Sequence, residues 1–129
     1  MMGLKEEFGR AAKWIEQQRM PTPGSHGMHK MFEINIRLLG GLLSAGTLSG
    51  EQALVDAAQR IADAMLPAFG SASGLPNSMV DLGTRASQNE GGGAILSEVG
   101  TLALELRGLS HELSHKAGSQ AYAKAADRC

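Results

Sequence analysis

An acid and a base lie four residues apart inside an otherwise apolar segment, MFEINIRLLGGLLSAG, at residues 31–46. At about 100° per residue, a helix through this segment puts Glu33, Arg37 and Gly40 on one narrow face. The pair has two interpretations: an exposed ion pair worth about 0.2–0.5 kcal/mol, or the wall of a polar pocket. Gly40 and Gly41 favour the pocket, because each glycine costs about 1 kcal/mol relative to alanine inside a helix unless a neighbour needs the space.

Three further acids recur at seven-residue intervals, at Glu98, Glu105 and Glu112, along one edge of a leucine-rich helical pattern. A stripe of this kind is usually the solvated face of an amphipathic helix, and we expect that here. A second polar wall facing the first is the alternative.

A third candidate site is the segment HELSHKAGSQA, at residues 111–121. The HExxH pattern puts His111 and His115 on one helical face as zinc ligands, with Glu112 as the general base for a metal-bound water. The longer pattern of the metzincin proteases needs a third histidine, and Ala121 stands in its place. A zinc metalloprotease is therefore the last of the functions considered.

The elements that must position these residues are predicted to be helical almost throughout. An apolar period on Leu4, Phe8, Ala11 and Ile15 predicts a first helix. Ser49 and Gln52 have the spacing of a capping box. The remaining helices are expected at residues 32–45, from the capping box to 66, 94–115 and from 119 onward. Residues 67–93, rich in glycine and serine, are predicted to be one long loop, so that the fold class is all-α.

Composition bounds the function further. The 129 residues suffice for one domain, the formal net charge is −1, and aromatic residues make up 4% of the chain. A balanced charge and few aromatic rings argue against a nucleic-acid partner. The single cysteine, Cys129, cannot form a disulfide within the chain. Because helical patterns run up to both ends, we expect the chain to be part of something longer.

A faint internal repeat supports that expectation. QALVDAAQR at residues 52–60 recurs as QAYAKAADR at 120–128, each after a leucine-rich helix and a short turn. Alanine-rich helices also resemble one another by chance, so both explanations stay open. A true repeat would make the unit a helical hairpin, which buries its apolar faces by stacking on neighbouring hairpins.

Three blocks in order, FEINIRLLGGLLSAGTLSG, LPAFGSASGLPNSMVDL and GGGAILSEVGTLALEL, resemble the N-terminal part of the class I α-mannosidases, glycoside hydrolase family 47. The resemblance implies that residues 1–129 are an incomplete, N-terminal part of a catalytic domain. It implies a partial (α/α)7 toroid and an inverting hydrolase that removes α-1,2-linked mannose. Calcium, the cofactor that holds the sugar in this family, would bind outside this chain. The loop at 84–93 departs from the family because it lacks the tryptophan often found there.

The resemblance also assigns roles to single residues. Glu33, in FEINIR, matches the acid that protonates the leaving oxygen, and Arg37 matches an active-site arginine. Glu98, in SEVGT, matches a carboxylate that lines the sugar site. The implied partners are oligomannose N-glycans and the remainder of the catalytic domain, in the lumen of the endoplasmic reticulum or Golgi. The rival interpretation is a non-catalytic hairpin scaffold or relic, such as a degradation-linked glycan binder.

Overall fold

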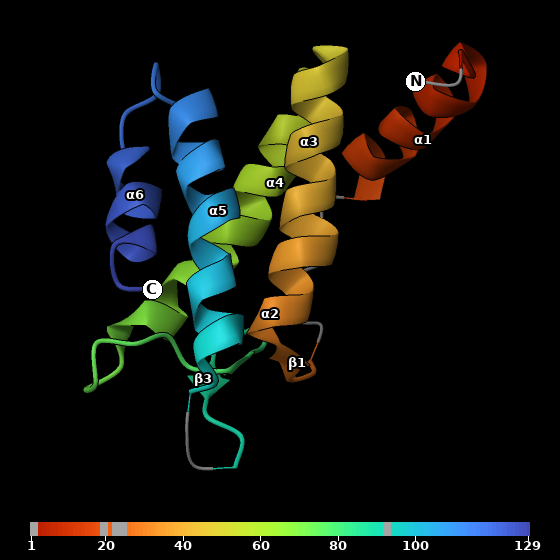
Figure 1. The fold of residues 1–129 in the computed structure, drawn as a ribbon. Helices are drawn as coiled ribbons and strands as arrows, with labels where there is room; N and C mark the ends of the chain where they lie inside the picture. The colour runs from red at the N-terminus through yellow and green to blue at the C-terminus, as the bar shows by residue number, and fades with distance from the viewer. Residues whose placement is uncertain (1–2, 19–20, 22–25, 92–93) are drawn as a thin grey trace.

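The structure is a computed structural model that describes residues 3–18, 21, 26–91 and 94–129. Helices dominate it, which confirms the predicted fold class and agrees with a partial toroid of helical hairpins (Figure 1). The α-helices are α1 (Lys5–Gln18), α2 (Met31–Glu33), α3 (Gly40–Ser49), α4 (Gln52–Met65), α5 (Leu96–Glu112) and α6 (Gln120–Ala126). A π-helix, η1 (Ile34–Leu39), joins α2 to α3, and a 3-10 helix, η2 (Leu66–Gly70), follows α4.

The elements α2, η1 and α3 form one long helical rod from Met31 to Ser49. Gly50 ends the rod in the left-handed conformation, at φ 75°, which glycine adopts without strain. The predicted capping box at this point is wrong. The Ser49 hydroxyl belongs to the last turn of α3, where it donates to the Ala45 carbonyl oxygen at 2.7 Å, and it does not cap α4.

The rod packs on α4, and α5 packs on α6, so that the helices pair as hairpins (Figure 1). The apolar faces predicted by the helical period meet in one core, which includes Leu39, Leu54, Ala58, Ile61, Met65, Leu106 and Leu109. Polar contacts join α4 to the C-terminal segment. The Tyr122 hydroxyl donates to Asp63 Oδ1 at 2.6 Å, and Lys116 Nζ donates to Asp56 Oδ1 at 2.9 Å.

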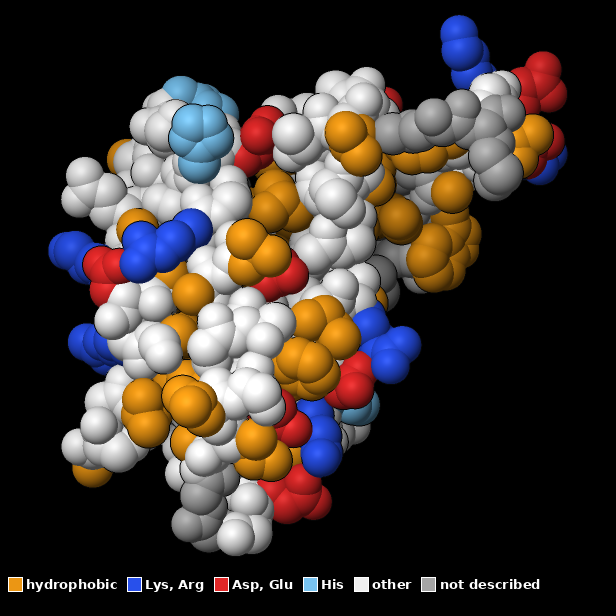
Figure 2. Space-filling model, viewed as in Figure 1, with side chains coloured by type: hydrophobic (Ala, Val, Ile, Leu, Met, Phe, Trp, Pro, Cys, Tyr) orange, Lys and Arg blue, Asp and Glu red, His pale blue; other side chains and the backbone are white. Residues whose placement is uncertain are grey.

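Helix α1 lies at one end of the molecule and packs on α4 (Figure 1). Its predicted apolar face is only partly used: Phe8 and Ile15 pack against the core, whereas Leu4 and Ala11 stay exposed. Figure 2 shows hydrophobic side chains gathered beneath this helix and across the face formed by α3 and α5. Considerable apolar surface therefore has no neighbour within the described residues.

The predicted loop at 67–93 is more ordered than its composition indicates. Besides η2, it contributes the short strands β2 (Met79–Val80) and β3 (Ser87–Gln88) to an antiparallel sheet with β1 (His29–Lys30), in the order β1-β2-β3. His29 pairs with Val80, and Met79 pairs with Gln88. Residues 92 and 93 of the predicted loop lie outside the described residues.

Asp81 fixes the turn that follows β2. Its carboxylate accepts hydrogen bonds from the backbone N–H groups of Gly27, Gly83 and Thr84, each at 2.9 Å. These bonds tie the segment before β1 to the turn between β2 and β3. They place the small sheet beside the start of the rod. Within the described residues, no helix is both long enough and apolar enough to cross a bilayer.

Candidate functional site

Glu33 and Arg37 lie where the rod changes its hydrogen-bond pattern. Glu33 is the last residue of α2, and Arg37 lies in the π-helix, where the Gly40 N–H reaches back five residues to the Asn35 carbonyl oxygen. Arg37 Nε donates to Glu33 Oε2, and this contact raises the pKa of the Arg37 guanidinium, first through the hydrogen bond and then through the carboxylate charge.

The ion pair is open to solvent in this chain. The Arg37 side chain is 72% exposed, and the Glu33 side chain is 42% exposed. Of the two interpretations from sequence, the described residues show the exposed pair. They provide one side of a site at most, and any pocket wall opposite the pair must come from elsewhere.

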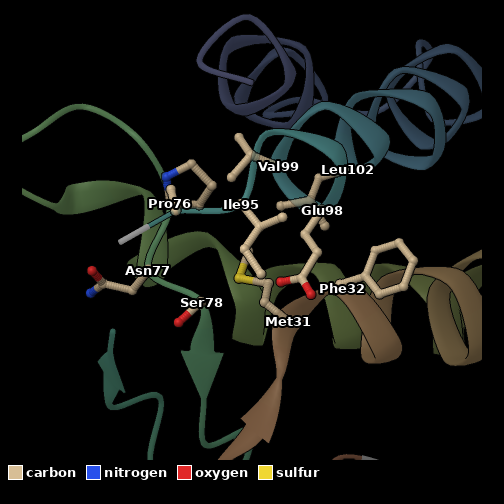
Figure 3. Close-up of a pocket in the computed structure, with 10 residues that line it drawn as sticks. Met31, Phe32, Pro76, Asn77, Ser78, Ile95, Glu98, Val99 and Leu102 are labelled. Carbon is tan, nitrogen blue, oxygen red and sulfur yellow. The ribbon is translucent and has the colours of Figure 1, made fainter. Parts of the chain in front are cut away.

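Glu98 lies in the first turn of α5, next to the beginning of the rod. It is half-buried and faces a small cavity of about 10 Å³ (Figure 3). Its neighbours there include Met31 and Phe32, the two residues that precede Glu33. A second small cavity, of about 40 Å³, lies against Glu98 on the side of Lys30, Ser78 and Glu90. Figure 3 shows the Glu98 side chain extending toward Met31 and Phe32.

The three residues singled out from sequence therefore come from two packed elements, the rod and α5. The segment at residues 76–78 closes the third side of the smaller cavity, and the sheet residues Lys30 and Met79 line the larger one. Polar groups of several kinds meet at this end of the molecule: carboxylates, a guanidinium and a lysine. Such a mixture suits a ligand with many hydroxyl groups, because each hydroxyl both donates and accepts.

The acidic stripe on α5 is not the solvated face that we expected. Glu105 Oε2 accepts a hydrogen bond of 2.7 Å from Asn35 Nδ2, and Glu112 Oε2 accepts one of 3.3 Å from Thr47. Both acids thus face the rod and form a polar seam between it and α5. The sequence signal was present in Asn35, a polar residue within an apolar helix, but spacing alone could not reveal its partner.

The two glycines of the rod differ in what surrounds them. A Cβ atom on Gly40 would lie 3.2 Å from Glu105 Cγ, so the predicted close approach is found there, with α5 as the neighbour. A Cβ atom on Gly41 would meet nothing within 4 Å. Packing in this chain therefore favours glycine at Gly40, where a larger residue would make the Glu105 side chain shift, but gives no reason for one at Gly41.

The geometry at the HExxH segment does not favour the zinc interpretation. Helix α5 ends at Glu112, so that His111 lies in its last turn while His115 lies beyond it, in the turn that follows. The two imidazoles therefore do not share one continuous helical face, as the zinc motif requires. Both histidines are exposed, and the described residues contain no group of three His, Cys, Asp or Glu side chains that could hold a metal ion.

Comparison with known proteins gives consistent matches. The model of glycosyl hydrolase family 47 matches residues 1–129. The chain is 40% identical over 115 residues to the mouse mannosyl-oligosaccharide 1,2-α-mannosidase IB, covering 86% of this chain and 18% of that protein. It is 39% identical to the human mannosidase IC over 127 residues, covering 96% of this chain and 19% of that protein.

An endoplasmic reticulum mannosyl-oligosaccharide 1,2-α-mannosidase of Schizosaccharomyces pombe is 39% identical over 113 residues, covering 86% of this chain and 22% of that protein. The chain thus spans about a fifth of the length of these curated relatives.

Proposed function

This chain belongs to glycosyl hydrolase family 47, and we propose that residues 1–129 are the N-terminal part of the catalytic domain of an inverting α-1,2-mannosidase. The substrate class is N-linked oligomannose glycans, from which the enzyme trims mannose. The observation that carries the proposal is the family match over the whole chain. The relatives named above, all mannosyl-oligosaccharide 1,2-α-mannosidases, support the reaction and the substrate class.

We assign three roles within this chain. Glu33 is the proton donor, and Arg37 and Glu98 bind the substrate. The exposed position of the Glu33–Arg37 pair supports the assignment, because a proton donor must reach an oxygen of an entering sugar. The contact with Arg37 also holds the Glu33 carboxyl group in one orientation.

The chemistry needs more than these residues. In the single displacement step, the Glu33 carboxyl group gives its proton to the glycosidic oxygen as the bond from that oxygen to the anomeric carbon breaks and water attacks that carbon. Inversion also requires a second carboxylate, about 6.5–9.5 Å from the first, that takes a proton from the attacking water on the opposite face of the sugar. We propose that this base lies in the remainder of the catalytic domain, so that the chain alone releases no mannose.

Calcium is implied by the family but does not fit the described residues as a site of their own. No group of three acidic, histidine or cysteine side chains gathers there. We therefore propose calcium as a cofactor of the complete catalytic domain, held by residues outside this chain. The family also implies the partners, which we propose are the oligomannose glycan and the remainder of the catalytic domain. The proposed location is the lumen of the secretory pathway.

The test is mannose release by the protein expressed from its complete gene, with an oligomannose N-glycan as substrate and calcium in the buffer. Glu33→Gln keeps the shape of the side chain but cannot donate the proton, so that kcat should fall by about 10²–10⁴-fold. The matched control is Glu51→Gln, which changes an exposed acid at the start of α4.

Inversion predicts that β-mannose is the first product, which proton NMR resolves before the anomers equilibrate. Full activity of Glu33→Gln would show that Glu33 is not the proton donor. A wild-type protein that binds the glycan and releases nothing would instead support the rival interpretation, a non-catalytic glycan-binding scaffold.

A further inference from the structure

The π-helix sets the orientation of the proposed proton donor relative to the rest of the rod. Glu33 immediately precedes η1, Arg37 lies within it, and Gly40 follows it. A π turn holds one more residue than an α turn between hydrogen-bonded groups, so its presence rotates the end that carries Glu33 relative to α3. π turns are rare and occur often at functional sites, which raises the question of what holds this one.

Asn35 is the polar anchor of the turn. Its side chain is 0% exposed, and Nδ2 donates to Glu105 Oε2 across 70 residues of sequence. A hydrogen bond to an ionised carboxylate is stronger than one between neutral groups, which favours this arrangement. The Asn35 Oδ1 atom nevertheless has no partner among the described residues. A buried polar group with an unsatisfied atom destabilises a fold, so stability alone is a poor reason for Asn35.

Glu105 reaches Asn35 through space that Gly40 leaves free. A Cβ atom on Gly40 would lie 3.2 Å from Glu105 Cγ and 3.3 Å from Glu105 Oε1. The same Cβ atom would lie 3.4 Å from the Asn35 carbonyl oxygen, which accepts the five-residue hydrogen bond of the π turn. Asn35, Gly40 and Glu105 therefore form one junction, in which the Glu105 carboxylate braces the turn from α5.

We propose that Glu105 is a positioning residue for the glycosidase reaction. It acts through Asn35 to hold the π turn and, through the turn, to orient the Glu33–Arg37 pair. The inference rests on the proposed function of that pair. Without the Glu105 carboxylate, the turn loses its brace and its hydrogen bond from Gly40 to Asn35 opens more often, so that Glu33 is no longer held toward the glycosidic oxygen.

The test uses the protein expressed from its complete gene, with kcat and KM measured on an oligomannose glycan. In Glu105→Leu, we expect kcat to fall by about 10²-fold, with a smaller rise in KM from the displaced Arg37, because a misplaced proton donor raises the energy of the transition state. Glu105→Gln retains an acceptor for Asn35 and should keep most of the activity. The control, Glu112→Leu, removes the next acid of the polar seam, which contacts Thr47 away from the π turn.

Gly40→Ala is a second route to the same junction, since its methyl group displaces the Glu105 side chain without deleting the carboxylate. We expect it to lower kcat as Glu105→Leu does, whereas Gly41→Ala should leave kcat unchanged. An equal fall in kcat in Glu105→Leu and Glu112→Leu would overturn the proposal. A rise in KM with kcat unchanged would overturn it as well.

Amide hydrogen exchange separates this inference from the proposed function, because it needs no activity. Glu105→Leu should speed exchange at the Gly40 N–H by at least about tenfold, whereas Glu112→Leu should not. Inactive wild-type protein would defeat the proposed function, and the exchange rates would still decide whether Glu105 holds the turn. Unchanged exchange at Gly40 in Glu105→Leu would overturn the proposal.

Discussion

At the scale of single residues, two buried polar side chains that link distant segments are not among those that the motifs single out. Asn35 and Asp81 are almost fully buried, at 0% and 6% exposure, and each links segments far apart in sequence. Glu33 and Arg37, by contrast, contact each other and otherwise face solvent. The motif residues are thus available for a ligand, while the buried ones fix the backbone that carries them.

Asp81 makes the sheet at the site sensitive to acid. Hydrogen bonds from the backbone N–H groups of Gly27, Thr84 and Gly83 lower the pKa of the Asp81 carboxyl group from 3.8 to about 2. A lowered pKa means that its stabilising effect is complete above the unfolded value, near pH 4, and is lost as the pH falls toward 2. We expect the Gly83 and Thr84 amides to lose protection from hydrogen exchange across that window.

The control for this prediction is Asp81→Ala, which removes both acceptor oxygens and should expose the same amides already at neutral pH. Wild-type protection that persists unchanged to pH 2 would show that the carboxylate does not hold the turn.

At the scale of helices and strands, the apolar period predicted the long elements well. The expected helix at 32–45 corresponds to the rod of α2, η1 and α3, and the expected helix at 94–115 corresponds to α5. Both were predictable because their apolar patterns extend over several turns. The apolar period could not predict two other features. The π turn depends on Glu105, 70 residues from Asn35, and the strand β1 pairs with β2 across about fifty residues.

The candidate site, too, could be predicted only in part. The residue types at Glu33, Arg37 and Glu98 could be picked out from sequence, and the family resemblance supplied the roles that we propose for them. Their surroundings could not be predicted, because the cavity beside Glu98 is built from the rod, α5 and the segment at residues 76–78. Pairing of distant segments decides those contacts, and single-helix spacing carries no information about it.

Gly46 gives a prediction at this scale, because α3 and α4 pack tightly against each other there. A Cβ atom there would lie 2.7 Å from Val55 Cγ2 and 3.1 Å from the Val55 backbone nitrogen. Gly46→Ala should therefore lower the free energy of unfolding by about 1–3 kcal/mol, as overpacking does in other cores. Chemical denaturation of the wild type and the variant measures the change.

Gly41→Ala is the matched control for Gly46→Ala, since its Cβ atom meets nothing within 4 Å. Alanine favours the helix by up to about 1 kcal/mol, so this variant should be stabilised. A Gly46→Ala variant as stable as Gly41→Ala would show that the two helices can separate without penalty.

At the scale of the whole molecule, the apolar surface is as informative as the core. Leu96 and Leu104 lie two helical turns apart on α5 and are 84% and 74% exposed, and hydrophobic side chains line that face in Figure 2. Exposed apolar patches of this kind often mark surfaces that pack against another domain or protein. Since the chain spans about a fifth of the length of its relatives, we expect the remainder of the catalytic domain to cover this face.

Leu104→Gln tests that expectation by giving different results in two contexts. In the 129-residue chain, the side chain already faces water, so the variant should change the free energy of unfolding by no more than about 0.5 kcal/mol and reduce self-association. In the protein expressed from its complete gene, the same leucine should be buried. Its loss should then lower the free energy of unfolding by about 1.5–3 kcal/mol.

The control is Leu109→Gln, which changes a leucine that is fully buried within the chain itself and should destabilise both proteins. Denaturation curves give the stabilities, and sedimentation velocity gives the association state. If Leu104→Gln were neutral in the complete protein as well, while Leu109→Gln destabilised both, then α5 would keep its outer face in water. Further hairpins of the catalytic domain would then not pack on that face of α5.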